Sequence, residues 1–214
     1  MDEKTPALVL VGASGHCKVV IDIIEREDRY RISHLLDDNA ALHGKTFFGY
    51  RVAGAMQSIL AGTLAERSLV FVSIGDNTAR LRIATWLRDN GFELARAVHP
   101  HAQIGRGAEI GAGTAVMAGA VVNSDAKIGQ NVIINTGATV DHDCVVEDGV
   151  HLAPGSHLCG GVRVGAGSFI GAGAVVAPGI RIGAKAVIGA GSTLISDVPE
   201  NVTAAGSPAR KISA

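Results

Sequence analysis

The second half of this chain repeats with a period of six residues, and this period restricts the possible folds more than any other feature. Sixteen aliphatic residues follow one another at intervals of six without a break, from Ile104 to Leu194. An amphipathic helix needs a period near 3.6 residues and a half-buried strand a period of 2, so neither explains the pattern. A sustained six-residue repeat is typical of a parallel β-helix.

The residues around each aliphatic support this interpretation. The residue directly after it is Gly, Asn or Asp in ten of the sixteen hexads, and the residue two before it is always small or β-branched. We expect an inward aliphatic on a short strand, followed by a corner that uses the left-handed backbone those three residue types tolerate. With three hexads per coil, aliphatics eighteen residues apart would stack in columns inside the prism.

The first half has a different composition and a different pattern. Seven of the eight aromatic residues precede residue 100, whereas 20 of the 28 glycines lie from residue 101 onward. Apolar strands are expected at 7–11, 69–74 and 92–98, with another ending at Leu36, and they alternate with helical segments such as 78–90. This alternation predicts a small α/β domain with a parallel, Rossmann-like sheet. We therefore place an α/β domain at 1–98 and a β-helix at 99–214.

Charge and composition narrow the class of protein. The formal charge of −1 provides no basic surface for nucleic acid. No apolar run has the roughly 18 residues that a membrane helix needs. The three cysteines form no CxxC motif, and the first residues lack the pattern of a secretory signal. A cytoplasmic protein that neither crosses a membrane nor binds nucleic acid is expected.

The turn Gly12-Ala13-Ser14-Gly15 joins a strand to a helix and offers backbone N–H groups to an anion. It is not GxGxxG, so a nicotinamide dinucleotide is not expected. Asp37 and Asp38 follow about 22 residues later at the end of the second strand, where ribose and base groups are often bound. A phosphate-bearing ligand is one interpretation, and a turn that binds nothing is the other.

A second candidate site lies where the repeat is irregular. Three successive corners lack the usual Gly, Asn or Asp and have Glu147, Ala153 and Cys159 instead. Near them lie three histidines, namely His142, His151 and His157. Irregularities of this kind are expected at functional or strained positions. His151 and His157 each precede an inward leucine and are therefore predicted to point outward, towards solvent or a neighbouring subunit.

The chain resembles the hexapeptide-repeat acyltransferases, and among them the nucleotide-sugar N-acetyltransferases that acetylate a 4-amino sugar, such as those acting on bacillosamine precursors and perosamine. The resemblance runs from about Leu8 to Ala209. Its motifs are Gly-Ala-Ser-Gly-His at 12–16, Leu-Asp-Asp at 36–38, Asn-Thr-Gly at 135–137, Asp-His-Asp-Cys at 141–144, and His151 with Pro154-Gly155.

The resemblance implies a role for each matched residue. His142 is the expected general base, and Asp143 raises its basicity. His151 is expected to contact the thioester end of acetyl-CoA, while Ala172 and Ala190 line the coenzyme. The residues expected to bind the nucleotide-linked amino sugar are Ser14, Gly15, His16, Asp37, Asp38 and Asn135. The resemblance also implies a left-handed β-helix, a homotrimer with active sites between subunits, and no metal.

The chemistry suits these residue types. A sugar amine that attacks a thioester must lose a proton, which a neutral imidazole can accept near neutral pH. Asp141 and Asp143 both adjoin His142, and either could be its partner. We expect direct transfer, because neither Cys144 nor Cys159 has an evident activating group.

Three alternatives remain at this stage. One is a zinc enzyme like the gamma-type carbonic anhydrases, although His151 and His157 are expected on diverging faces. A second is a β-helix scaffold with a nucleotide-sensing domain. The third is an acetyltransferase with a hydroxyl acceptor, as in sialic acid O-acetylation.

Overall fold

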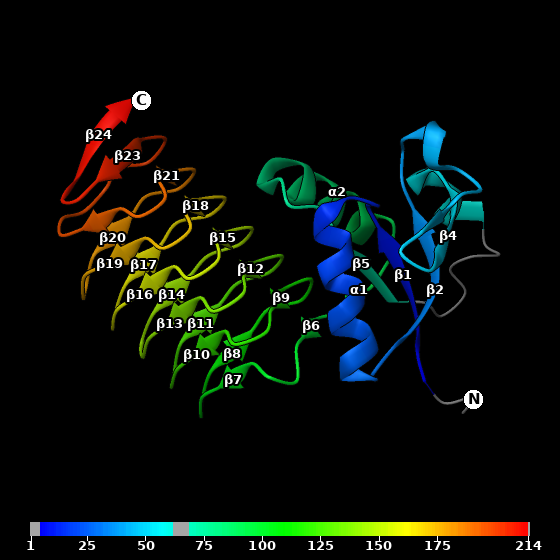
Figure 1. The fold of residues 1–214 in the computed structure, drawn as a ribbon, viewed down its shortest axis with the longest axis horizontal. Helices are drawn as coiled ribbons and strands as arrows, with labels where there is room; N and C mark the ends of the chain where they lie inside the picture. Colours follow the sequence, from blue (N-terminus) through cyan, green and yellow to red (C-terminus); the bar gives the residue numbers. More distant parts are fainter. Residues whose placement is uncertain (1–4, 62–68, 214) are drawn as a thin grey trace. The chain divides into compact units, whose positions relative to one another are not determined.

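The structure is a computed structural model that describes residues 5–61 and 69–213. The described residues form two compact units, one ending at Pro100 and the other beginning at His101 (Figure 1).

The first unit is built on a five-stranded sheet of order β3-β4-β2-β1-β5. Strands β1 (Ala7–Val11), β2 (Arg31–Leu36), β4 (Tyr50–Gly54) and β5 (Leu69–Val72) run parallel, whereas β3 (Thr46–Phe47) pairs antiparallel with β4. The sheet is therefore mixed, not purely parallel as the alternation suggested. Chain order reverses at β1, which has β2 on one side and β5 on the other. Ligands of open α/β sheets bind outside the carboxyl ends of strands at such a point.

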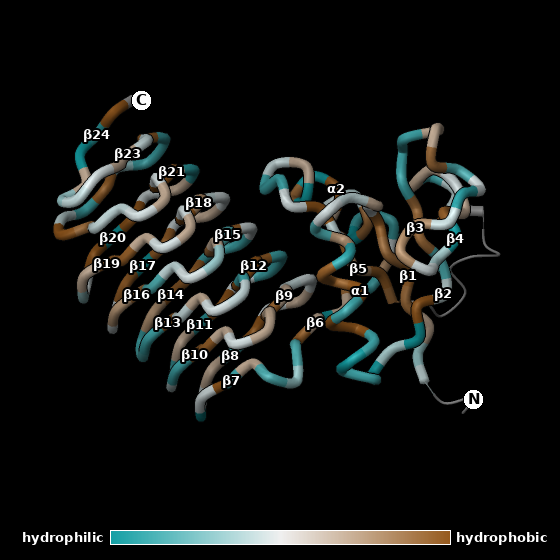
Figure 2. The backbone as a smooth tube through the Cα atoms, in the orientation of Figure 1, coloured by the Kyte–Doolittle hydropathy of each residue, from teal (hydrophilic) through white to brown (hydrophobic). Residues whose placement is uncertain are grey.

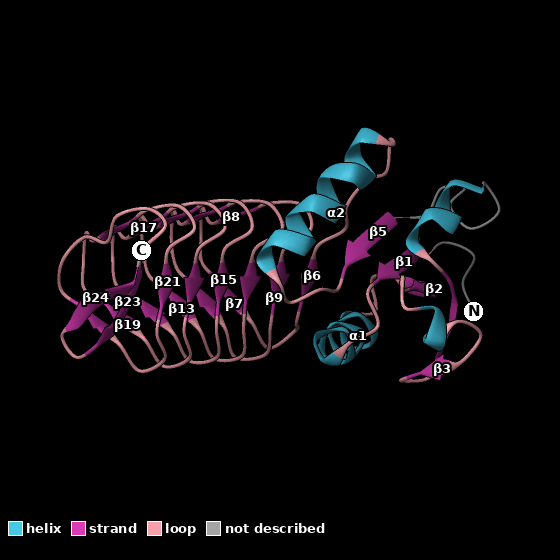
Figure 3. Ribbon diagram, turned by 90° about the horizontal axis from the view of Figure 1, so that it is seen from above, coloured by secondary structure: helices cyan, strands magenta, loops and turns pink. Residues whose placement is uncertain are grey.

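Two helices cover opposite faces of this sheet (Figure 3). Helix α1 (Gly15–Glu27) buries Cys17, Val20, Ile21, Ile23 and Ile24, and helix α2 (Asn77–Asp89) lies after β5. Short 3₁₀ turns, η1 (Ala40–Leu42) and η2 (Met56–Ala61), flank β3 and β4. Strands β1 and β5 are apolar along their length in Figure 2, as expected for strands buried on both faces.

The strand expected at 92–98 is wrong as a continuous element. Only Leu94 bridges to Val70, and a two-residue strand, β6 (Ala97–Val98), follows. Leu94 and Ala95 are both buried, which breaks the period of two at that step, and burial alternates again from Ala95 to Val98. The segment therefore adds a single bridge, and not a sixth strand, to the β3-β4-β2-β1-β5 sheet.

The second unit is a parallel β-helix of two-residue strands arranged in three flat faces. Up to β22, strands on one face pair in parallel at a spacing of eighteen residues, as Val122 does with Val140 and Val140 with Leu158. The last pair, β23 with β24, is antiparallel. The first face contains β7 (Gln103–Ile104), β10 (Val121–Val122), β13 (Thr139–Val140), β16 (His157–Leu158), β19 (Val175–Val176) and β22 (Thr193–Leu194).

The second face contains β8 (Glu109–Ile110), β11 (Lys127–Ile128), β14 (Val145–Val146), β17 (Arg163–Val164) and β20 (Arg181–Ile182). The third contains β9 (Ala115–Val116), β12 (Ile133–Ile134), β15 (His151–Leu152), β18 (Phe169–Ile170) and β21 (Val187–Ile188), and it continues into β23 (Thr203–Gly206) and β24 (Ala209–Ser213).

The repeated aliphatics fill the prism as predicted. Val122, Val140 and Val176 have no exposed surface, and Leu158 has 1%. Ile104 is 41% exposed because it belongs to the first coil, which has no coil stacked beneath it on that side. The column of aliphatics is therefore the core that holds each corner of the prism in place.

The corner chemistry differs from the prediction. Fifteen successive corners, from Gly107 to Gly191, have their left-handed residue three positions after the inward aliphatic and not directly after it. Directly after the aliphatic, glycine serves close stacking, since a Cβ on Gly111 would lie 2.4 Å from the carbonyl oxygen of Gly129 in the next coil.

The corners near the histidines are consequently regular. Those that contain Glu147, Ala153 and Cys159 have glycine at the left-handed position, namely Gly149, Gly155 and Gly161. The irregularity noted in the sequence concerns the contact between coils and not the bend of the chain.

Candidate functional site

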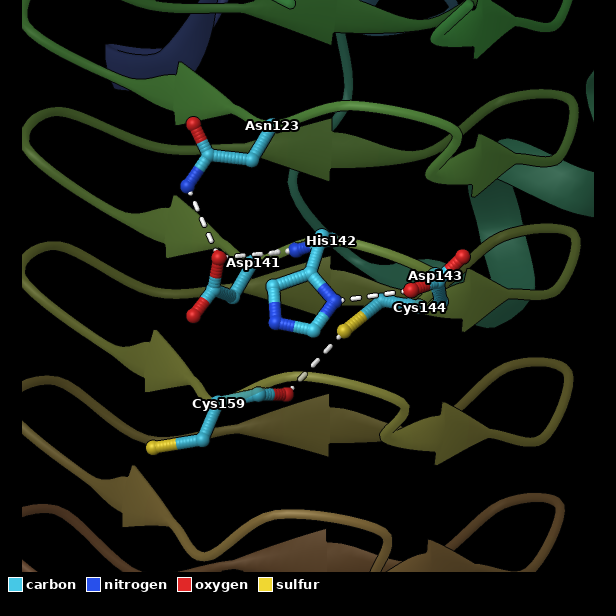
Figure 4. A network of polar contacts seen from close by, with 6 residues as sticks. All are labelled: Asn123, Asp141, His142, Asp143, Cys144 and Cys159. Carbon is cyan, nitrogen blue, oxygen red and sulfur yellow. Dashed lines mark hydrogen bonds and ion pairs between the residues drawn. The ribbon is translucent and has the colours of Figure 1, made fainter.

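The site in the second unit centres on His142, in the corner that follows β13. Its ring nitrogen Nδ1 lies 2.7 Å from Oδ2 of Asp143 (Figure 4). Both side chains are largely exposed, at 62% and 68%. A nitrogen this close to a carboxylate donates its proton, so the neutral ring presents Nε2 as its basic atom.

Asp143 reaches the ring because of its place in the corner. It has a φ of 59°, in the left-handed position that glycine fills in most coils. Aspartate is one of the few residues that tolerates this conformation. The corner geometry of the repeat therefore positions the carboxylate.

Asp141 has a different role from Asp143. Its Oδ1 accepts hydrogen bonds from the backbone N–H of His142 at 2.8 Å and from the side-chain amide of Asn123, one coil earlier, at 2.9 Å. The hydrogen bond from Asn123, and to a smaller extent the one from the backbone of His142, hold the pKa of Asp141 below its usual range. The Asp141 carboxylate is thus stabilised as an anion, and its two hydrogen bonds link the backbone of His142 to Asn123 in the preceding coil.

The carboxylates make His142 more basic. Its pKa is raised above 6.5, first by the hydrogen bond from its ring to Asp143 and then by the charge of Asp141. The arrangement is a solvent-accessible imidazole with an oriented second nitrogen, which is what a general base requires.

Cys144 points into the prism, as its position predicts. Its side chain has no exposed surface, and its Sγ donates to the carbonyl oxygen of Cys159 at 3.1 Å. Burial raises the pKa of the Cys144 thiol. A buried, protonated thiol is a poor nucleophile.

His151 and His157 point outward, also as predicted, and lie on different faces of the prism. The side-chain amide of Asn135 lies 3.2 Å from Nε2 of His151, whose ring packs edge-on against Phe169 with 5.1 Å between ring centroids. His157 is exposed, with Nδ1 2.9 Å from Oγ1 of Thr139. Across residues 5–61 and 69–213, no three His, Cys, Asp or Glu side chains are grouped to hold a metal ion.

Ala172 and Ala190 occupy equivalent corners of consecutive coils, after β18 and β21, and both are exposed. The backbone N–H of Gly191 donates to the carbonyl oxygen of Ala172 at 2.8 Å. This edge of the prism therefore carries only methyl groups at these two positions, and a long ligand could lie along it.

The glycine turn of the first unit lies at the carboxyl end of β1. The backbone N–H of Ala13 donates to Oδ2 of Asp37 at 2.7 Å, and the other carboxylate oxygen of Asp37 accepts from the N–H of Asn39 at 2.8 Å. Asp37 thus ties the turn to the end of β2. Ser14 is exposed at the N-cap of α1, and its side chain makes no cap hydrogen bond.

Asp38 and His16 lie around the same edge of the sheet. Asp38 is exposed, and its Oδ1 accepts from the N–H of Met56 at 2.9 Å. His16 lies in the first turn of α1, directly after Gly15, and its Cβ is 3.9 Å from where a Cβ on Gly75 would be. The structure brings the expected residues of this unit to one edge.

Arg80 supports this edge and was not predicted. It is buried, and its guanidinium donates to the carbonyl oxygens of Ile74 and Gly75 and to the side chain of Asn77. Burial lowers the pKa of Arg80 to about 10, so it stays charged at neutral pH. Its position in a helix, amid other arginines, gave no signal in the sequence.

No helix in the described part of the chain is long and apolar enough to cross a lipid bilayer.

Comparison with known families matches both halves of the chain. Residues 7–87 match the family described as PglD N-terminal domain. Overlapping segments between residues 107 and 196 match the bacterial transferase hexapeptide family. The hexapeptide match identifies the prism as a left-handed β-helix.

Individual relatives agree with the family matches. UDP-N-acetylbacillosamine N-acetyltransferase from Bacillus subtilis is 39% identical over 110 residues, which span 50% of this chain and 49% of that protein. Perosamine N-acetyltransferase from Caulobacter crescentus, solved as a histidine-to-asparagine variant with CoA and GDP-perosamine, is 39% identical, with a TM-score of 0.92 over 97% of both chains.

A third relative is the acetyltransferase domain of PglB from Neisseria gonorrhoeae, solved with acetyl coenzyme A. It is 35% identical, with a TM-score of 0.89 over 97% of this chain and 100% of that domain.

Proposed function

Because the chain belongs to the hexapeptide-repeat sugar N-acetyltransferases, we propose that it transfers the acetyl group of acetyl-CoA to the 4-amino group of a nucleotide-linked 4-amino-4,6-dideoxy sugar. The observation that carries the proposal is the pair His142 and Asp143, an exposed imidazole whose Nδ1 is bonded to a carboxylate at 2.7 Å. GDP-perosamine and CoA are bound in the Caulobacter relative, and a bacillosamine derivative is named for the Bacillus relative.

In the proposed reaction, the sugar amine attacks the carbonyl carbon of the thioester. A C–N bond forms, and Nε2 of His142 accepts the proton that the amine loses. The C–S bond then breaks, and the departing sulfur of CoA takes the proton from His142. Asp143 stabilises the imidazolium that exists between the two steps.

The two units would divide the substrates between them. The turn at Ser14, Gly15 and His16, with Asp37 and Asp38, would hold the nucleotide sugar, since a helix N-terminus and adjacent N–H groups favour phosphate. The corners at Ala172 and Ala190, with His151, would hold the coenzyme, and Asn135 would orient His151 and contact the sugar.

A complete site would need a second copy of the chain. His142 follows a strand of the first face, whereas His151 lies on the third face, so the two side chains leave one prism in different directions. We assign the active sites to the clefts between subunits of a homotrimer, with His142 from one copy and His151 from its neighbour.

The decisive experiment measures thiol release from acetyl-CoA with four acceptors in parallel. These are UDP- and GDP-linked 4-amino-4,6-dideoxy sugars and their 4-hydroxyl counterparts. We expect release with an amine and little with either hydroxyl. Release only with the hydroxyl acceptors would instead establish an O-acetyltransferase, and release with none would contradict the proposal.

The His142→Asn variant tests the base in the same assay. We expect kcat to fall by about 10²- to 10⁴-fold, the usual contribution of a general base, while acetyl-CoA binding measured by calorimetry stays close to that of the wild type. His157→Asn is the matched control, because that histidine is also exposed on the prism but is assigned no role. Equal turnover of His142→Asn and the wild type would exclude His142 as the base.

A further inference from the structure

Gly160 is an exception in the repeat. It lies two positions after the inward Leu158, and at that position the other fifteen hexads all carry a side chain, from alanine at 112 to arginine at 106. Gly160 is not among the residues with a left-handed φ. The backbone at this position therefore accepts a Cβ, and another constraint must account for glycine.

That constraint is the ring of His142. The register of β13 on β16, with Val140 paired to Leu158, places Gly160 one coil after His142. A Cβ on Gly160 would lie 2.7 Å from both Cε1 and Nε2 of His142 and 3.3 Å from Nδ1. Favourable contacts between such atoms lie at about 3.5–4.0 Å, so the ring could not keep its position.

The backbone around the contact leaves the ring as the part that would move. The N–H of Gly161 donates to the carbonyl oxygen of His142 at 2.9 Å, and the N–H of Gly179 donates to that of Gly160 at 2.9 Å. These ladder bonds hold the coils at a fixed spacing. A displaced ring would rotate about its Cα–Cβ bond and carry Nδ1 away from Asp143, which now lies 2.7 Å from it.

We propose that Gly160 is a positioning residue, whose missing side chain is the space in which the His142 ring lies with one nitrogen on Asp143 and the other directed to the acceptor amine. The inference deepens the proposed function and rests on it for its kinetic consequence. The position of the ring itself does not depend on which reaction the protein catalyses.

The first test is the Gly160→Ala variant. We expect kcat to fall by about 100-fold, the order of loss that a misplacement of about 1 Å causes, with the KM for both substrates little changed. NMR titration of the His142 imidazole, assigned by the loss of its signal in His142→Asn, gives a readout that needs no turnover. We expect the pKa of His142 to fall towards its ordinary value, because the ring leaves Asp143.

Two cysteines lie on the neighbouring segments, but the Cys144 thiol is buried in the prism and the Cys159 sulfur is turned away from the ring (Figure 4). The groups that raise the pKa of the ring are the carboxyls of Asp143 and Asp141 on its own segment. Of these, only the bond to Asp143 requires the present orientation of the ring. Ala184→Gly is the matched control, since it exchanges the same two residue types at the same hexad position on another edge, and it should change neither kcat nor the titration.

A double variant separates the ring contact from general damage to the fold. In His142→Ala/Gly160→Ala the ring is gone and the new Cβ has room. Its Tm should therefore equal that of His142→Ala, and its residual kcat should be no lower. A Gly160→Ala variant with the wild-type kcat and titration would overturn the inference. A double variant whose Tm lies below that of His142→Ala would overturn it as well. Absence of transfer by the wild type would overturn the proposed function alone.

Discussion

At the scale of single residues, the site is defined by the different bonds that two neighbouring aspartates make to His142. Asp143 bonds to the ring, whereas Asp141 bonds to the backbone of His142 and to Asn123. Sequence adjacency could not distinguish the two. The difference arises because Asp143 occupies the left-handed corner, where its side chain folds back towards the ring.

The pH dependence of kcat/KM follows from this arrangement. A base must be neutral to accept a proton, so if His142 is the base we expect activity to be lost as pH falls through its raised pKa. In Asp143→Asn the main cause of the increase is removed, and the acidic limb should therefore move to lower pH, with a lower plateau rate. Asp125→Asn is the matched control, because Asp125 fills the same left-handed corner one coil earlier. An unchanged acidic limb in Asp143→Asn would show that another group controls it.

The buried thiol leads to a second expectation. If transfer is direct, Cys144→Ala should keep kcat within about two-fold of the wild type, because the thiol only donates to the carbonyl oxygen of Cys159 inside the prism. Burst kinetics and mass spectrometry of the enzyme mixed with acetyl-CoA would check this. An acetylated Cys144 that forms and decays at the turnover rate would disprove direct transfer.

At the scale of elements, the glycine turn depends on β2 as much as on its own glycines. Asp37 closes the gap between the ends of β1 and β2 by accepting the N–H of Ala13. In Asp37→Ala the turn loses this tie, and the KM for the nucleotide sugar should rise about ten-fold, the equivalent of one hydrogen bond to a charged group. Steady-state kinetics with each substrate varied would test it.

Comparing the KM values for the two substrates shows which of the two domains the Asp37→Ala substitution affects. The KM for acetyl-CoA should stay the same in Asp37→Ala, and Asp22→Ala, which removes a surface carboxylate paired with Arg26, should change neither constant. A change confined to the acetyl-CoA kinetics would contradict the division of substrates between the two units.

The elements also show what sequence alone can supply. The period of six predicted the β-helix, its inward column and the outward histidines, because each depends only on repeated local geometry. It assigned the left-handed residue to the wrong corner position, since both positions are rich in glycine for different reasons. It missed Arg80, because nothing in the sequence separates this buried arginine from the exposed ones on the same helix. The hexad pattern does mark Gly160 as an exception, but the contact with the His142 ring that explains it appears only in the structure.

At the scale of the whole molecule, a shared site makes a specific prediction. His142→Ala and His151→Ala should each have low activity, and a hybrid assembled by refolding the two together should regain part of it, since one interface would then contain both histidines. Mixing without refolding is the control. Failure of the hybrid to exceed its parents would place both histidines in one copy.

The constant coil length also determines which insertions and deletions this protein can accept. Removing one hexad between His151 and Ala172 would keep every later aliphatic directed inward, so the prism would still close. It would also move every later strand and corner to a different face of the prism. Ala172 would then no longer lie at the edge that follows the face of His151. Removing three hexads would restore that edge with Ala190 in place of Ala172. A length change therefore preserves the arrangement of the faces only when it is a multiple of eighteen residues. Any other multiple of six would leave a folded prism whose proposed coenzyme edge lies on another side.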